Sequence, residues 1–194
     1  MGEPLRLGAI ILTGGTAARM DGADKAAIEL DGVTLLERAL AATMSAVEVV
    51  VVGDQVPTTR PVTWTREDPH GGGPAAGLLA GLDRFLQTPD LVAVLAVDMP
   101  KVNAGTVARL TWAVESEASY DGAVLEDPDG RTQPLCAVYR TESLQRVRPE
   151  SLEEEFGLPV RTLLAHLILA HVPAVGSEAR DVDTWEDLAE LRGE

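Results

Sequence analysis

Six apolar segments of strand length constrain the fold of this chain most strongly. They lie at Leu7–Leu12, Val47–Val52, Leu91–Val97, Gly122–Leu125, Pro134–Tyr139 and Leu167–Val172. Their Val, Leu, Ile and Ala residues run almost without interruption, instead of alternating with polar residues, which is typical of strands buried on both faces. The sequence therefore predicts a sheet that is covered by helices on both sides.

Segments with the apolar spacing of helices lie between and after these strands. They are Leu35–Met44, Pro74–Leu86, Val107–Glu117, Pro159–His166 and Thr184–Leu191. Because strand and helix alternate through the first half of the chain, we expect right-handed crossovers and a largely parallel sheet. We predict a Rossmann-like α/β fold with three layers, α/β/α, in which residues 1–194 form a single domain.

The alternation weakens after Glu117. The stretch VLEDPDGRTQPLCAVY, residues 124–139, has two apolar runs around an Asp-Pro-Asp-Gly turn. This pattern predicts a hairpin, and with it an antiparallel excursion from the parallel sheet. The acidic run Glu153–Glu155 is expected on a solvent-exposed helix face. The tryptophans are expected to pack in three different elements; they are Trp64, Trp112 and Trp185.

The charge of the chain excludes some partners. It has 16 Lys and Arg against 31 Asp and Glu, a net charge of −15. Such a surface repels nucleic acids and anionic membranes, although a few cations in a cleft can still bind a small anionic substrate. Cys136 is the only cysteine, which excludes an internal disulfide, and we expect it to be buried. With no signal peptide or membrane span in the sequence, the expected compartment is the cytoplasm.

A glycine loop follows the first predicted strand, in the stretch LTGGTAARMDGADKAAI, residues 12–28. Gly14 and Gly15 have no Cβ atoms, so their amides can approach phosphate oxygens closely, and Arg19 and Lys25 supply cations nearby. The loop lacks the Gly-Lys-Ser/Thr of a P-loop and the G-x-G-x-x-G of a dinucleotide-binding fold. It reads either as an anion site or as a tight turn that binds nothing.

Two further places are expected at the same edge of the sheet, where the strands end. Asp98 follows a buried strand, in a position suited to hold Mg²⁺ against substrate phosphates; the alternative is that it caps a turn or helix. Asp68 precedes Gly71, Gly72 and Gly73, which lead into a helix beginning at Pro74. That glycine run suits a ligand-facing loop and a structural turn equally.

Taken together, these motifs resemble a known family. LTGGTAARMDGADKA is similar to the L-A-G-G-x-x-x-R-M-G-G-x-D-K signature of molybdenum cofactor guanylyltransferases, which belong to a wider group of nucleotidyltransferases. GGGPAAG, AVDMP, QPLCAVY and DVDTWEDL resemble further family motifs in the same order along nearly the whole chain. Thr13 stands where the family usually has Ala, and Gly53 where a side chain often contacts the nucleotide.

The resemblance implies roles for individual residues. Leu12, Thr13 and Gly14 would contact guanine and ribose, Gly15 would line the phosphates, and Gly53 and Asp68 would help to hold the nucleoside. Arg19 and Lys25 would neutralise the triphosphate, and Asp98 would be the magnesium ligand. Gln133 and Pro134 would line the pocket of the second substrate.

The reaction that the resemblance implies is transfer of GMP from GTP to the terminal phosphate of molybdopterin or molybdenum cofactor, with release of pyrophosphate. Mg²⁺ would be the cofactor, and partners could include the molybdenum cofactor insertion machinery or target molybdoenzymes. Two alternatives stay open: a nucleotidyltransferase that uses CTP or another phosphorylated acceptor such as a sugar phosphate, and a nucleotide-binding module without turnover.

Asp183 carries one further expectation. In DVDTWEDL, Thr184 and Asp187 have the spacing of a capping box, so Asp183 could simply be a charge near a helix N-terminus. The resembling family has Asn at this position, close to the metal. We predict that Asp183 lies within metal reach of Asp98, so that both carboxylates share one Mg²⁺.

Overall fold

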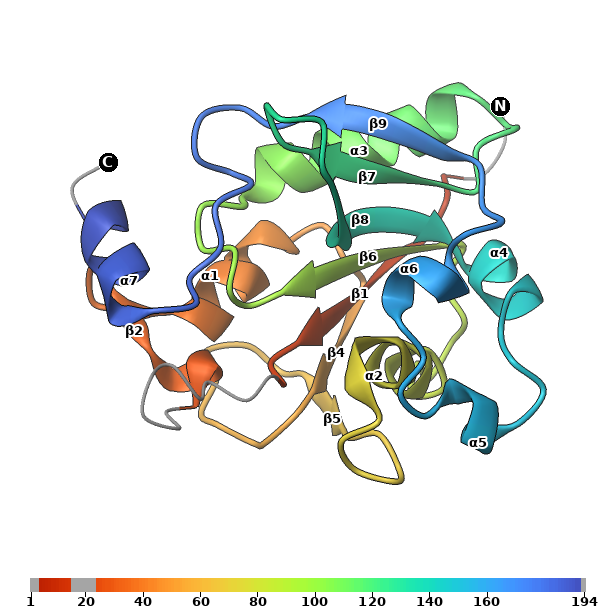
Figure 1. The fold of residues 1–194 in the computed structure, drawn as a ribbon, viewed down its shortest axis with the longest axis horizontal. Coiled ribbons are helices and arrows are strands. Elements are labelled where there is room, and N and C mark those ends of the chain that lie inside the picture. The colour runs from red at the N-terminus through yellow and green to blue at the C-terminus, as the bar shows by residue number, and fades with distance from the viewer. Residues whose placement is uncertain (1–3, 15–23, 193–194) are drawn as a thin grey trace.

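A computed structural model describes residues 4–14 and 24–192 of the chain. Within these ranges seven strands form one twisted sheet, in the order β5-β4-β1-β6-β8-β7-β9 (Figure 1). The strands are β1 Leu7–Leu12, β4 Glu48–Val52, β5 Thr63–Thr65, β6 Leu91–Ala96, β7 Gly122–Glu126, β8 Thr132–Arg140 and β9 Leu169–Pro173. A separate small hairpin pairs β2 (Glu29–Leu30) with β3 (Val33–Thr34).

Helices cover both faces of this sheet. They are the 3-10 helix η2 Lys25–Ala27 and the α-helices α1 Leu35–Ala42, α2 Gly73–Leu82, α3 Ala104–Ser116, α4 Thr141–Arg146, α5 Leu152–Glu155, α6 Val160–Leu163 and α7 Trp185–Leu191. Alternate residues of the central strands enter two separate apolar clusters. One cluster packs the sheet against α1, α3 and α7, and the other packs it against α2, α4 and α6. The predicted α/β/α fold is confirmed.

The pairing directions also follow the prediction. β1 lies between β4 and β6 and is parallel to both, and β5 is parallel to β4. β8 runs antiparallel to both of its neighbours, β6 and β7, whereas β9 is parallel to β7. The predicted antiparallel excursion is therefore β8, which enters the sheet from the β7–β8 hairpin.

Side-chain hydrogen bonds fix the turn of that hairpin. Asp127 Oδ1 accepts hydrogen bonds from the backbone N–H groups of Asp129, at 2.9 Å, and Arg131, at 2.8 Å. Gly130 has a φ of +79°, a conformation that glycine adopts without a steric cost. The Asp-Pro-Asp-Gly sequence thus supplies both the acceptor and the residue that the turn requires.

Element boundaries differ from the predictions where a local signal acts. α3 begins at Ala104, before the predicted Val107, because Asn103 and Thr106 form a reciprocal capping box. α2 ends at Leu82, four residues before the predicted end, and α6 is shorter than its predicted segment. The short elements β2, β3, β5 and α4 carry too few residues for a periodic pattern and were not predicted.

Two predictions about side chains were wrong in part. Glu153 and Glu154 are exposed as predicted, but Glu155 is buried, and its carboxylate accepts from Arg148 Nε at 2.8 Å. Trp64 packs against a core cluster as predicted, whereas Trp112 and Trp185 remain 71% and 47% exposed. Cys136 is buried as predicted. In the described part of the chain, every helix is too short or too polar to span a bilayer.

Candidate active site at the carboxyl ends of the parallel strands

Three parallel strands end side by side and define the position of the site. Leu12, the last residue of β1, pairs with Val52 of β4 on one side and with Ala96 of β6 on the other. The residues that follow these strands therefore meet at one edge of the sheet. The glycine loop, Asp98 and the glycine run after Asp68 were predicted to share this edge. The register places Thr13, Gly53 and Asp98 just beyond these three strand ends.

Lys25 lies at this edge with two carboxylates around its amine. It begins η2, whose N-terminus is capped by Asp24 Oδ1 accepting from Ala26 N–H at 3.0 Å. Its Nζ lies 2.8 Å from Asp183 Oδ1 and 3.5 Å from Asp98 Oδ2. Only 9% of the Lys25 side chain is exposed, so the ammonium group is held in a largely water-excluded place.

The pKa values of this cluster reflect burial and close charge. Burial alone would lower the pKa of Lys25, but Asp183 and Asp98 outweigh that effect, so its pKa is raised and the amine stays protonated. Burial raises the pKa of Asp98; Lys25 opposes that rise, while Asp181 and Asp183 add to it by repulsion. The site thus concentrates more negative charge than one lysine neutralises.

The C-terminal segment of the chain reaches Asp98 by a backbone contact. The N–H group of Val182 donates to the carbonyl oxygen of Asp98 at 2.7 Å, and the Val182 side chain is fully buried. Thr184 and Asp187 form the predicted capping box of α7, and Asp187 also accepts from the N–H of Asp183. With these bonds in place, Asp183 and Asp98 both contact the ammonium group of Lys25 and so lie close together; the magnesium ion that they would share stays a prediction.

The carboxylates of Asp98 and Asp183 suit a magnesium ion. Both bond to one ammonium group, so their oxygens converge, and Mg²⁺ in phosphate-binding sites is commonly held by one or two carboxylates together with substrate oxygens. No cluster of three or more candidate metal ligands occurs among the described residues. Two carboxylates are a donor set that fits a magnesium ion with further ligands from substrate and water.

A cavity of about 210 Å³ adjoins Asp98. Its lining includes Gln133 and Pro134, the two residues expected to contact the second substrate. They lie at a bulge: Leu125 pairs with Gln133 but Val124 pairs with Ala137, so three extra residues of β8 leave the ladder with β7. Bulges of this kind redirect side chains next to functional sites. Tyr139 Oη donates to the Pro134 carbonyl at 2.8 Å and holds the bulge in place.

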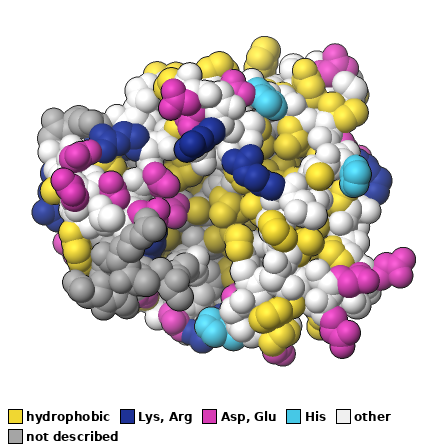
Figure 2. Space-filling view, in the orientation of Figure 1, with side chains coloured by type: hydrophobic (Ala, Val, Ile, Leu, Met, Phe, Trp, Pro, Cys, Tyr) yellow, Lys and Arg dark blue, Asp and Glu magenta, His cyan; other side chains and the backbone are white. Residues whose placement is uncertain are grey.

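The surface around this edge has two parts. On the face drawn in Figure 2, hydrophobic side chains fill the centre and continue to the right, whereas acidic side chains gather to the left. Asp181 lines the cavity beside Asp98, and Arg161 binds the strand next to Gln133 by donating to the Thr132 carbonyl at 2.8 Å. Asp181 is the first residue of the DVDTWEDL motif, but no role was predicted for it. Arg161 was not identified from the sequence, because it lies in the short helix α6 outside any motif.

The predicted nucleotide-binding residues are only partly brought together. The side chain of Leu12 is buried in a core cluster, and its carbonyl oxygen accepts from the N–H of Val97 at 3.1 Å. A Cβ atom at Gly14 would meet no described atom within 4 Å, which agrees with open space at this position. Gly15 and Arg19 lie outside the described residues.

Asp68 lies apart from the lysine and its two carboxylates. It lines a different cavity, of about 290 Å³, between the loop after β5 and helices α2 and α5. Among the described residues, no hydrogen bond or ion pair links Asp68 to Lys25, Asp98 or Asp183. Gly73 has a φ of +86°, so the glycine run also has a structural role at the start of α2.

The fold and this edge define a nucleotidyltransferase, and the comparisons agree. A MobA-like NTP transferase domain matches residues 9–172. A probable molybdenum cofactor guanylyltransferase of Natronomonas pharaonis is 32% identical, over 94% of this chain and 95% of the relative. The chain therefore belongs to the MobA-like NTP transferase family.

Solved structures with the same fold extend to other nucleotidyltransferases. The molybdopterin-guanine dinucleotide biosynthesis protein A of Archaeoglobus fulgidus superposes with a TM-score of 0.71 and 22% identity, over 95% of this chain and 96% of the other. The 2-C-methyl-D-erythritol 4-phosphate cytidylyltransferase of Thermus thermophilus superposes with a TM-score of 0.64 and 20% identity, over 94% and 96%. At these identities, the likeness establishes the fold alone.

Proposed function

We propose that this protein transfers GMP from GTP to the terminal phosphate of molybdopterin or molybdenum cofactor, forming a guanine dinucleotide and pyrophosphate. The observation that carries the proposal is the position of Lys25, Asp98 and Asp183. They converge at the ends of the parallel strands, beside a cavity lined by Gln133 and Pro134. The name of the Natronomonas relative supports the choice of both substrates.

In the proposed reaction, an oxygen of the acceptor phosphate attacks the α-phosphorus of GTP. A new P–O bond forms, and the bond to the β-phosphate oxygen breaks, with its electron pair leaving on pyrophosphate. No residue forms a covalent bond, because this chemistry depends mainly on positioning and on stabilising charge. Lys25 donates to phosphate oxygens, and Arg19 is proposed to do the same from the glycine loop.

The other proposed site residues contact either the nucleotide or the acceptor. The nucleotide is held by Thr13, Gly14 and Gly15 and by the backbone of Leu12 and Gly53. Asp68 contacts it from the loop after β5. Gln133 and Pro134 contact the acceptor. Asp98 and Asp183 would hold Mg²⁺, which when bound offsets the negative charge of the triphosphate. The product would pass to an insertion partner or a molybdoenzyme in the cytoplasm.

One assay tests this function. The protein is incubated with Mg²⁺, molybdenum cofactor and either GTP or CTP, and pyrophosphate and dinucleotide are measured. Asp98→Asn should abolish turnover. Asp90→Asn is the matched control, because Asp90 immediately precedes the same strand, β6, at its other end, where it accepts from Arg6 N–H at 2.7 Å.

The outcomes separate the candidate functions. Formation of the guanine dinucleotide with GTP, lost in Asp98→Asn but retained in Asp90→Asn, supports the proposal. Equal or faster turnover with CTP would replace the guanylyl assignment with a cytidylyl one. Binding of GTP without pyrophosphate release, with any phosphorylated acceptor offered, would leave only a nucleotide-binding module.

A further inference from the structure

Residues 174–183 connect β9 to α7 and contain no helix or strand, yet they carry two of the acidic residues near the site. Asp181 lines the cavity beside Asp98, and Asp183 bonds to Lys25. A segment without regular structure needs other contacts to hold its side chains at a fixed distance from Asp98. The hydrogen bond from Val182 N–H to the Asp98 carbonyl is one such contact.

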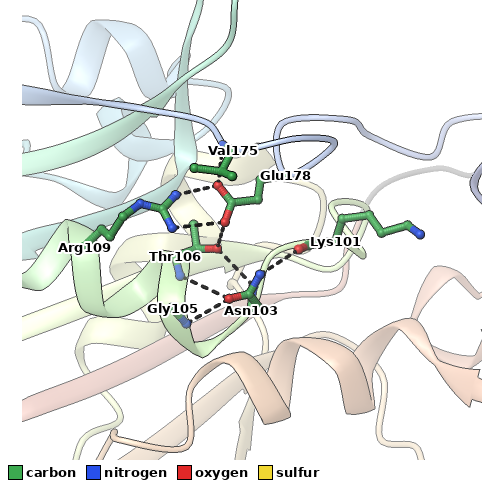
Figure 3. Close-up of polar contacts among 7 residues, drawn as sticks. All are labelled: Lys101, Asn103, Gly105, Thr106, Arg109, Val175 and Glu178. Atoms are coloured by element: carbon green, nitrogen blue, oxygen red, sulfur yellow. Dashed lines mark hydrogen bonds and ion pairs between the residues drawn. The ribbon is translucent and has the colours of Figure 1, made fainter. Parts of the chain in front are cut away.

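The carboxylate of Glu178 bonds to groups in α3 and in its own segment (Figure 3). It accepts from Thr106 Oγ1 at 2.6 Å, from Arg109 Nη1 at 3.2 Å and from Arg109 Nη2 at 2.5 Å. It also accepts from the N–H of Val175 at 2.8 Å, within its own segment. Only 6% of the Glu178 side chain is exposed. A buried carboxylate therefore ties this segment to the first turns of α3.

The same contacts extend to the loop that carries Asp98. Thr106 Oγ1 donates to Glu178 and at the same time accepts from the N–H of Asn103, the N-cap of α3. The side chain of Asn103 in turn donates to the carbonyl of Lys101, three residues after Asp98. Figure 3 shows this chain of bonds from Val175 to Lys101. Glu178 thus connects residues 174–183, which carry Asp183, with the loop that carries Asp98.

We propose that Glu178 is a positioning residue, which fixes the separation of Asp183 and Asp98 by joining residues 174–183 to the start of α3. The proposal builds on the function proposed above, in which these two carboxylates act together. Glu178 itself contacts neither substrate nor metal. Its effect passes through Val182 and the backbone on either side of Asp98.

A purely structural role for Glu178 makes a different prediction, and Asp121 provides the matched control. Asp121 is a second carboxylate that binds several donors: Ser143 Oγ at 2.6 Å, Arg146 Nη2 at 2.5 Å and Ile168 N–H at 2.8 Å. Its side chain is 14% exposed, and its partners lie in α4 and next to β9, not in residues 174–183. Asp121→Asn should therefore lower stability without changing the geometry of Asp183.

The experiment compares Glu178→Gln with Asp121→Asn by two measurements. The first is hydrogen exchange of the free protein, followed on peptides that cover residues 179–184, including the Val182 amide. The second is the magnesium concentration for half-maximal turnover with GTP and molybdenum cofactor. Two variants of the buried Thr106 test the same connection. Thr106→Val removes the hydroxyl group with little change in side-chain size, and Thr106→Ser keeps it.

Glu178→Gln and Thr106→Val should speed exchange in residues 179–184 and raise the required magnesium concentration roughly tenfold, as loss of an outer-shell partner does in metal sites. Asp121→Asn and Thr106→Ser should change neither. Equal effects of Glu178→Gln and Asp121→Asn, in proportion to their losses of thermal stability, would overturn the proposal, as would unchanged exchange in Glu178→Gln. If the wild-type protein shows no transfer, the proposed function fails, but the exchange measurement still decides the role of Glu178.

Discussion

The hydroxyl group of Thr13 fills the space that a side chain at Gly53 would need. Thr13 Oγ1 donates to the Val52 carbonyl at 3.0 Å, and a Cβ atom placed on Gly53 would overlap that hydroxyl oxygen. Gly53 also has a φ of +147°, a backbone conformation that residues other than glycine rarely adopt. Thr13 and Gly53, two of the positions that differ from the family pattern, are therefore sterically linked: the Thr13 hydroxyl group occupies the space beside Gly53, next to the predicted nucleotide site.

Gly53→Ala should lower the free energy of unfolding by about 1–3 kcal/mol, from backbone strain and overlap with Thr13. Adding Thr13→Ala should recover part of this loss, because the overlap disappears while the strain remains. Urea denaturation of both single variants and the double variant measures the coupling between the two positions.

Gly32 provides the control for this cycle. Its φ is +76°, but a Cβ atom there would have no described neighbour within 4 Å. Gly32→Ala should be destabilised by strain alone, and Thr13→Ala should not relieve it. If Thr13→Ala changes the free energy of unfolding equally in the Gly53→Ala and Gly32→Ala proteins, Thr13 does not limit the space at Gly53.

Lys25→Met should reduce turnover by roughly 100- to 1,000-fold at saturating GTP, the usual loss when one transition-state donor is removed. It should also lower the melting temperature in the absence of metal, because Asp98 and Asp183 would then face each other without a cation. In Lys25→Met/Asp183→Asn, removal of one charge should restore part of that stability. A double variant that melts below Lys25→Met would contradict this account of the cluster.

Asp183→Asn should raise the magnesium concentration for half-maximal turnover roughly tenfold, since an amide binds the ion more weakly than a carboxylate. The maximal rate at high magnesium should recover. Asp129→Asn, an exposed substitution in the β7–β8 turn, is the control and should keep the wild-type requirement. An unchanged requirement in Asp183→Asn would leave Asp98 as the sole protein ligand and Asp183 as a partner of Lys25 only.

Most of the fold could be predicted because its signals are local and repeated. Strands buried on both faces have continuous apolar runs, and the Asp-Pro-Asp-Gly turn identified the one antiparallel insertion. The rule that ligands bind beyond the carboxyl ends of parallel strands placed Asp98 at the same edge as the start of the glycine loop. The same rule placed Asp68 there, whereas Asp68 lines a separate cavity. Short elements such as β5 and α4 could not be predicted, because a few residues do not establish a period.

The contacts of the site were harder to predict than its position. Asp183 was expected near Asp98, but no sequence pattern indicated that Lys25 would bond to both. Glu178 was missed because its partners, Thr106 and Arg109, lie about 70 residues away in α3, in positions with no recognisable motif. Glu155 was misjudged although its partner lies only seven residues away: its acidic neighbours suggested a solvent-exposed face, and no pattern indicated that Arg148 would bond to its carboxylate.

Cys136 should report on unfolding. Its side chain, on β8, is fully buried in the core cluster that packs the sheet against α1, α3 and α7, and burial raises the pKa of the thiol to about 12. Since the thiolate is the reactive form, the native protein should not react with a disulfide reagent near pH 8. Reaction should begin only as urea unfolds the chain, with the same midpoint as the loss of circular dichroism. Rapid labelling in buffer would show that this part of the sheet opens without global unfolding.

Acid should destabilise the protein partly through Glu178. Burial alone would raise the pKa of this carboxyl group, but hydrogen bonds from Arg109, Thr106 and the Val175 N–H outweigh burial and hold it below its ordinary value of 4.5. The folded state therefore binds this proton more weakly than the unfolded state does. Its contribution to stability is complete above the unfolded pKa and is lost as pH falls through the lower, folded pKa.

The free energy of unfolding should accordingly fall between about pH 5 and pH 3, and Glu178→Gln should show a shallower fall, because it has no proton to take up at this position. Glu153→Gln is the control: this residue is exposed in α5, and the variant should keep the wild-type slope. Urea denaturation at a series of pH values measures the slopes directly. Identical slopes in Glu178→Gln and the wild type would mean that the Glu178 carboxylate binds its proton equally in both states, which would contradict its strong bonding to Arg109 and Thr106.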